Sequence, residues 1–172
     1  MKRPLIINFK NYTEVSGEKA VKLAKAAQTV ARKLKVEIVV APPQPALATV
    51  AKKVRMPVIC QHVDDEKVGS STGYFVPEIA KSYGAVGSLI NHSEHRIEMK
   101  IMAVSKENPA IITKSIEAAG SRSKVVCGAG ITGKGDVAKA MDLGSHGILV
   151  ASGIIKASSW VDKIADLAAG MR

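Results

Sequence analysis

The chain has 172 residues, enough for one well-buried core but too few for two comfortable domains, so we expect a single domain over residues 1–172. Hydrophobic residues make up 47% and aromatic residues only 3%, so the core must be built from Val, Ile, Leu and Ala, the usual filling of buried parallel strands. The formal net charge of +10 favours anionic ligands, and no apolar run approaches the roughly 18 residues that a membrane-spanning helix requires.

Short apolar runs that predict buried strands alternate with segments of helical periodicity along the chain. Strands are expected at 4–9, 36–41, 57–60, 86–90, 124–127 and 147–151. Helices are expected to begin at Ser16, near Pro45, at Pro77, at Asn108-Pro109, after Gly133 and near Ser159. The pattern is indistinct only between Glu94 and Lys106. Regular alternation of this kind predicts an α/β fold with a parallel sheet of about six strands.

The segment Asn91–Arg96 consists entirely of side chains that can bind ligands or take part in catalysis. It places an imidazole, a hydroxyl, a carboxylate and a guanidinium where the strand at 86–90 ends, and the carboxyl ends of parallel strands are where such folds hold their active sites. His92 is therefore the lead candidate for a functional residue, with a solvated loop histidine as the alternative. A metal site is disfavoured, because one H-x-x-H in a loop, His92 to His95, is weak evidence.

Two glycine-containing turns follow the last two predicted strands. The first, Gly128–Gly133, matches the G-x-G-x-x-G pattern of dinucleotide sites, but the following strand ends in Ala151-Ser152-Gly153 where the ribose-binding carboxylate should stand. Two adjacent turns that offer backbone N–H groups to one phosphate, as in the last loops of a (β/α) barrel, are the favoured interpretation. Plain tight turns are the alternative.

The cysteines and lysines bear on the cellular compartment of the chain and on whether it binds nucleic acid. Cys60 and Cys127 each end an apolar run without metal-ligand spacing, which predicts buried free thiols in a reducing compartment. Because Met1-Lys2-Arg3 leads directly into a strand rather than into a signal peptide, we expect a cytoplasmic location. The lysines lie mainly on helix faces with no interleaved aromatic residues, so nucleic-acid binding is not expected.

Considered together, the strand-end motifs of the chain resemble those of triosephosphate isomerases of the archaeal type. The resemblance follows the family's order over nearly the whole chain and rests on Asn8-Phe9-Lys10, Gln61-His62-Val63-Asp64, Gly69–Gly73, Asn91–Glu94 with Arg96, Cys127–Ile131 and Leu149–Gly153. It implies a triose phosphate as substrate, no cofactor, no metal, and a homo-oligomer in which the loop at 64–74 reaches into the partner subunit.

The resemblance also implies a role for each matching residue. Lys10 would be the cation near the carbonyl and phosphate of the substrate, Asn8 its neighbour, and His92 the neutral imidazole that polarises the substrate oxygens. Ser93, Glu94 and Arg96 would support them, with Glu94 orienting Lys10. The residues implied to lie on the phosphate are Gly130, Ala151, Ser152 and Gly153.

One region departs from the family pattern. Family members carry a fifth strand, its helix and a sixth strand, ending in the Glu-Pro base and a glycine-rich lid, before the stretch that matches Val104–Pro109. Only seven residues separate Arg96 from Val104 here, so we expect these elements to be absent. The sequence thus predicts a shortened TIM-type (β/α) barrel of about six parallel strands, open or completed by oligomerisation. Its isomerase activity should be very low or lost, and the alternative is a non-catalytic phosphate-binding or structural relict.

Overall fold

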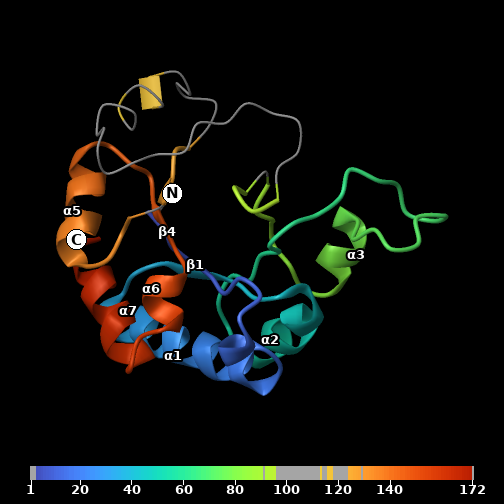
Figure 1. Cartoon of the computed structure of the whole chain (residues 1–172), viewed down its shortest axis with the longest axis horizontal. Coiled ribbons are helices and arrows are strands. Elements are labelled where there is room, and N and C mark those ends of the chain that lie inside the picture. The colour runs from blue at the N-terminus through green and yellow to red at the C-terminus, as the bar shows by residue number, and fades with distance from the viewer. Residues whose placement is uncertain are drawn as a thin grey trace.

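The alternation of strands and helices is present in the computed structural model of the chain, which describes residues 3–90, 92–95, 113, 116, 117, 124–128 and 130–171 (Figure 1). Its regular elements are β1 (Leu5–Asn8), α1 (Glu18–Leu34), β2 (Ile38–Ala41), α2 (Leu47–Lys53), α3 (Pro77–Ser82), β3 (Cys127–Gly128), α5 (Lys134–Asp142), β4 (Ile148–Val150), α6 (Ser152–Ile155) and α7 (Trp160–Ala169). Two short 3-10 turns, Thr13–Val15 and Gln44–Ala46, precede α1 and α2. Arg96 lies outside the described residues, as does the helix expected after Asn108 except for residues 113, 116 and 117.

The strands form one parallel sheet in the order β2-β1-β4-β3. Leu5 of β1 pairs with Ile38 of β2 on one side and with Ile148 of β4 on the other, so the first strand of the chain lies in the middle of the sheet. Leu5 and Ile7 point to the same face of β1 and are fully buried, whereas Ile6 on the opposite face is only partly buried. Among the described residues the sheet is all-parallel and does not close, which confirms the expected α/β class and is consistent with a shortened barrel.

Two of the predicted strands join the sheet only through single parallel bridges, Val40 with Val58 and Cys60 with Ser88. These bridges continue the sheet beyond β2, first to segment 57–60 and then to segment 86–90. The last segment is predicted to be buried, but Val86 is 72% exposed and Ile90 is 63% exposed. Apolar side chains on a strand are buried by a neighbouring strand and a covering helix. The exposure of Val86 and Ile90 therefore accords with the single bridge by which segment 86–90 joins the sheet.

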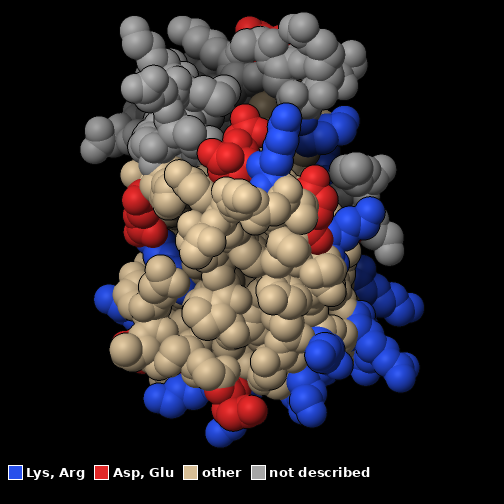
Figure 2. All heavy atoms as spheres, turned by 90° about the vertical axis from the view of Figure 1, so that its right-hand side faces the viewer, with Lys and Arg blue, Asp and Glu red and all other residues tan. Residues whose placement is uncertain are grey.

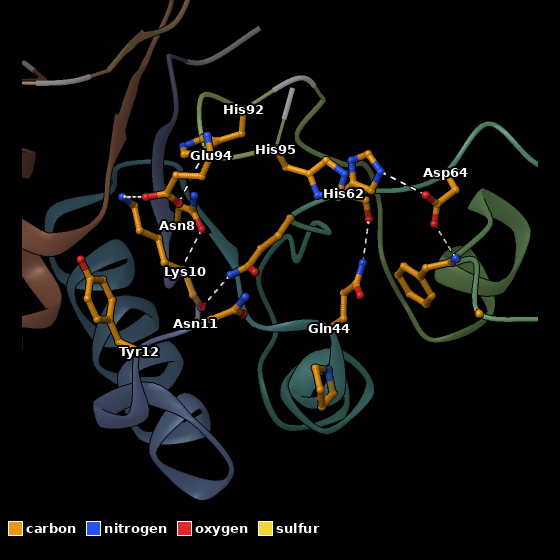
Figure 3. A pocket seen from close by; sticks show the side chains of 14 residues that line it. Asn8, Lys10, Asn11, Tyr12, Gln44, His62, Asp64, His92, Glu94 and His95 are labelled. Carbon is orange, nitrogen blue, oxygen red and sulfur yellow. Dashed lines mark hydrogen bonds and ion pairs between the residues drawn. The ribbon is translucent and has the colours of Figure 1, made fainter. Parts of the chain in front are cut away.

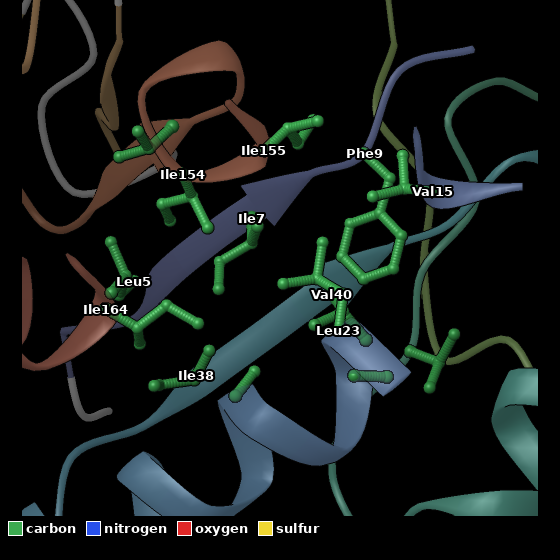
Figure 4. Close-up of a cluster of buried hydrophobic side chains, with 14 of the residues drawn as sticks. Leu5, Ile7, Phe9, Val15, Leu23, Ile38, Val40, Ile154, Ile155 and Ile164 are labelled. Atoms are coloured by element: carbon green, nitrogen blue, oxygen red, sulfur yellow. The ribbon is translucent and has the colours of Figure 1, made fainter. Parts of the chain in front are cut away.

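The helices cover one side of the sheet, with α1 in contact with both α7 and α2, and α5 in contact with α7 (Figure 1). The apolar stripe predicted for α1 faces this core: Ala20, Leu23, Ala24, Ala27 and Val30 are buried. Around β1 and β2, aliphatic side chains and one phenylalanine fill the interior, including Leu5, Ile7, Phe9, Val15, Leu23, Val40 and Ile164 (Figure 4). Both cysteines are free and buried, as predicted.

Helix starts agree with the sequence signals at Pro77, after Gly133 and at Ser159, but not at Ser16. Ser159 caps α7 as expected, because its hydroxyl accepts a hydrogen bond from the Asp162 N–H at 3.3 Å. Helix α1, however, begins at Glu18 rather than at Ser16. The Ser16 hydroxyl donates to the Thr13 carbonyl at 3.0 Å and closes the preceding 3-10 turn instead. None of the described helices is long and apolar enough to span a membrane.

Candidate active site

A cavity of about 200 Å³ lies where β1, β3, β4 and segment 86–90 reach their carboxyl ends. Its lining contains every residue that the sequence assigns to substrate binding, together with the candidate histidine: Asn8, Lys10, His92, Ser93, Gly130, Ile131, Leu149, Val150, Ala151, Ser152 and Gly153. Parallel strands place their carboxyl ends along one edge, which is why positions so distant in sequence meet here. Glu94 lines a neighbouring cavity instead.

Lys10 is held from three directions (Figure 3). Its backbone N–H donates to Asn8 Oδ1 at 3.0 Å, and its carbonyl accepts from Gln61 Nε2 at 2.9 Å. Its ammonium group donates to Glu94 Oε1 at 2.5 Å. The backbone of Lys10 has φ of 51°, a left-handed conformation that costs a non-glycine residue energy and that persists only where surrounding contacts impose it. The contact between Glu94 and Lys10 is the one that the predicted orienting role requires.

The imidazole of His92 accepts a hydrogen bond at Nδ1 from the backbone N–H of Glu94, at 3.3 Å. A neutral ring that accepts at Nδ1 carries its proton on Nε2, so that nitrogen is available as a donor toward a ligand. Oε2 of Glu94 lies 3.7 Å from Nδ1, beyond hydrogen-bond distance, and Oε1 of the same carboxylate contacts Lys10. The geometry therefore favours a ring that carries its proton on Nε2 rather than on Nδ1.

The two glycine-containing turns approach one another across the smaller cavity. Gly130 has φ of +67°, a conformation that L side chains rarely adopt. A Cβ placed on Gly153 would lie only 3.7 Å from the Ile131 carbonyl oxygen. The first turn is anchored by Asp136, whose Oδ2 accepts from the Thr132 N–H at 2.7 Å and from the Gly133 N–H at 3.2 Å. Backbone groups of both turns thus lie within reach of one small ligand.

A second cavity of about 830 Å³ adjoins the first at Asn8, Lys10 and His92 (Figure 3). Its wall includes His62, Asp64 and His95. The rings of His62 and His95 are stacked, with centroids 4.1 Å apart and planes inclined by 18°. Asp64 Oδ2 accepts from the Phe75 N–H at 2.7 Å, which lowers the pKa of that carboxyl, and His62 contributes to the same shift.

Metal binding finds no support in the part of the chain that is described. No group of three or more His, Cys, Asp or Glu side chains there could hold a metal ion. His62 and His95 present stacked faces rather than converging nitrogen atoms.

Gln61 was named in a sequence motif but given no role, and the structure shows that it supports Lys10. It follows segment 57–60 directly, and its amide donates both to the Lys10 carbonyl at 2.9 Å and to the Ala41 carbonyl at 3.2 Å. The end-of-strand position that singled out His92 applies equally to Gln61 and could have identified it. The stacking of His62 on His95 has no comparable signal, because it joins two loops that are distant in sequence.

Comparison with known proteins shows to which family the chain belongs. The family model described as Triosephosphate isomerase matches residues 4–119. The triosephosphate isomerase of Cenarchaeum symbiosum is 39% identical, with 97% of each chain covered, and that of Caldivirga maquilingensis is 36% identical, with 98% of this chain and 97% of the relative covered. The alignment with the Cenarchaeum symbiosum protein runs over 216 positions, more than the 172 residues of this chain, so it places gaps in this chain. The chain belongs to the triosephosphate isomerase family.

Proposed function

We propose that the smaller cavity binds a triose phosphate. The observation that carries the proposal is the common lining of this cavity by Lys10, His92 and the two glycine-containing turns. The phosphate would lie against the turns at 130–131 and 151–153, and the carbonyl end between the Lys10 ammonium and His92 Nε2. A cation and backbone N–H groups suit a phosphate, and a neutral imidazole that donates from Nε2 can polarise a carbonyl oxygen.

The same cavity accounts for a proposed low turnover in the interconversion of dihydroxyacetone phosphate and glyceraldehyde 3-phosphate. This reaction needs a base that removes a carbon-bound proton. Among the described residues that line the cavity there is no carboxylate, and Glu94 in the neighbouring cavity contacts Lys10. The seven residues between Arg96 and Val104 leave no room for the strands that carry the family's glutamate and lid. A missing general base alone lowers the rate roughly 10²- to 10⁴-fold.

A titration with 2-phosphoglycolate and a coupled isomerase assay test both parts of the proposal. We expect the ligand to bind and the turnover to lie at least about 10²-fold below that of a full-length archaeal relative, because the base is missing. Residual turnover should disappear in His92→Gln, while His146→Gln, outside the cavity lining, serves as the control.

Three other outcomes of the titration and the assay would contradict part of the proposal or favour its alternative. A flat titration contradicts the proposed binding site. Turnover equal to that of the relative contradicts the proposed loss of catalysis. Binding with no turnover at all favours the alternative, a phosphate-binding protein that is no longer an enzyme.

We further propose that the chain self-associates through the face that carries segment 64–76 and α3. The centre of this face is free of charged side chains, which lie mainly around its margin (Figure 2). Large apolar side chains on these elements are exposed to solvent: Val68, Tyr74, Ile79 and Tyr83. An exposed apolar surface with a charged margin is characteristic of a protein–protein contact.

Static light scattering tests this association. We expect the unmodified chain to be a dimer or larger at micromolar concentration, and Tyr74→Lys and Ile79→Lys to shift it toward the monomer, because each replaces an exposed apolar side chain on these elements with a charged one. Val161→Lys is the matched control, since Val161 is 43% exposed but lies on α7. A monomeric unmodified chain would rule the association out.

A further inference from the structure

We infer that His62 and His95 are positioning residues that hold the turn carrying His92 in its working geometry. The inference rests on the proposed function, in which His92 donates to the ligand. It starts from the stacked rings, whose centroids lie 4.1 Å apart with planes inclined by 18°. Stacking at this distance is an attractive contact between two flat side chains, and here it joins two loops that are otherwise distant in sequence.

His62 is the fixed member of the pair. Its side chain is only 14% exposed, its Nε2 lies 3.3 Å from Asp64 Oδ1, and its carbonyl accepts from Gln44 Nε2 at 3.4 Å. Asp64 is itself fixed, because its second oxygen accepts from the Phe75 N–H at 2.7 Å. The lowered pKa of Asp64 is consistent with a carboxylate held in its charged form by these donors.

His95 is the member whose position depends on the stack. It is exposed to solvent and ends the turn formed by residues 92–95. Its backbone N–H donates to the His92 carbonyl at 2.8 Å, and within the same turn the Glu94 N–H donates to His92 Nδ1 at 3.3 Å. These two bonds fix the backbone of His92 and the orientation of its ring. The His62–His95 stack therefore attaches the whole turn to the loop that follows segment 57–60.

The attachment reaches Lys10 as well. Glu94 lies between His92 and His95, and its carboxylate contacts the Lys10 ammonium at 2.5 Å. A turn that shifts when the stack is lost would move together the Glu94 N–H that donates to His92 and the Glu94 carboxylate that accepts from Lys10. We therefore expect the stack to act on ligand binding through both groups, although neither His62 nor His95 lines the smaller cavity.

The test compares His95→Ala with His95→Phe in the full chain, with 2-phosphoglycolate as the ligand. Alanine removes the ring, whereas phenylalanine keeps a flat ring and removes only the nitrogen atoms. We expect a dissociation constant roughly 2- to 10-fold higher for His95→Ala and near the unmodified value for His95→Phe. His62→Phe should likewise retain affinity better than His62→Ala. Because His95 is exposed, the thermal midpoints of both of its variants should match that of the unmodified chain.

Nuclear magnetic resonance of the His92 imidazole nitrogens, without ligand, provides an independent readout. The unmodified chain and His95→Phe should show the Nε2-protonated ring, and His95→Ala should show a mixture of both tautomers. If this signal does not change in His95→Ala, or if phenylalanine fails to restore it, the inference is wrong. If 2-phosphoglycolate does not bind the unmodified chain, the proposed function is wrong, and the ligand-free spectra still decide whether the stack positions His92.

Discussion

Replacing Lys10 with glycine is expected to weaken 2-phosphoglycolate binding strongly while leaving the fold as stable as before or more stable. The loss of a charged donor to the ligand should raise the dissociation constant roughly 10- to 100-fold. The ion pair with Glu94 contributes little to stability, because Glu94 is 57% exposed and its carboxylate can be solvated. Isothermal titration calorimetry and urea unfolding on the same preparation measure the two effects.

The expected gain in stability comes from the backbone. Lys10 has φ of 51°, and the left-handed conformation costs a residue with a Cβ about 1–2 kcal/mol. Glycine removes that cost but loses about 0.5–1 kcal/mol through its greater freedom in the unfolded chain, so the net gain lies between zero and about 1.5 kcal/mol. Energy stored in the backbone at a ligand-binding residue is typical of functional sites.

Lys35 provides a matched control within the same chain. It has φ of 55°, lies exposed at the end of α1 and donates its N–H to the Ala31 carbonyl. Lys35→Gly should give a similar stability change, because glycine is favoured at this position after a helix, with no change in ligand affinity. Unaltered affinity in Lys10→Gly would exclude Lys10 as the ligand-binding cation, and an equal loss in Lys35→Gly would show that the effect is not local.

Gly170→Ala is expected to be the most destabilising single substitution of a small residue, by about 3 kcal/mol. Gly170 is buried at the end of α7, where it lies against α5. A Cβ at this position would meet the Lys134 carbonyl oxygen at 2.3 Å and Val137 Cβ at 2.8 Å, so the two helices would have to move apart. A chain of this size should then lose roughly 6–12 °C in its thermal midpoint.

Gly135→Ala on α5 is the matched control. A Cβ there would meet no atom within 4 Å, and the residue is exposed in a helix. Alanine should therefore stabilise the chain by up to about 1 kcal/mol through helix propensity. Urea denaturation of both variants separates the effects. A Gly170→Ala chain as stable as the unmodified one would mean that α5 and α7 can separate at little cost.

The sequence predicted those parts of the fold that depend on local pattern. Apolar runs located β1, β2 and β4, and Ser159 with Asp162 located the start of α7. Segment 86–90 has an equally apolar pattern, but the pattern does not reveal that Val86 and Ile90 are left exposed in the folded chain. The start of α1 was misplaced by two residues, because the Ser16 hydroxyl had a second acceptor within reach.

The candidate site, like the fold, could be predicted only where it depends on local sequence pattern. Asn8, Lys10 and His92 could be identified because each follows the end of an apolar run, and parallel strands bring such ends together. The left-handed backbone of Lys10 and the stacking of His62 on His95 could not be predicted, since both arise from contacts between loops that only the folded chain assembles. The resemblance to the family supplied the roles, and the structure supplied the contacts.

The central position of β1 has a consequence for synthesis of the chain. Leu5 of β1 is synthesised long before its partner Ile148 of β4. Until then one edge of β1 has no neighbouring strand, and an unpaired apolar strand is prone to join other chains. The order β2-β1-β4 therefore postpones completion of this sheet until β4 has been synthesised. Nascent chains that stall before β4 would leave this apolar strand with an unpaired edge.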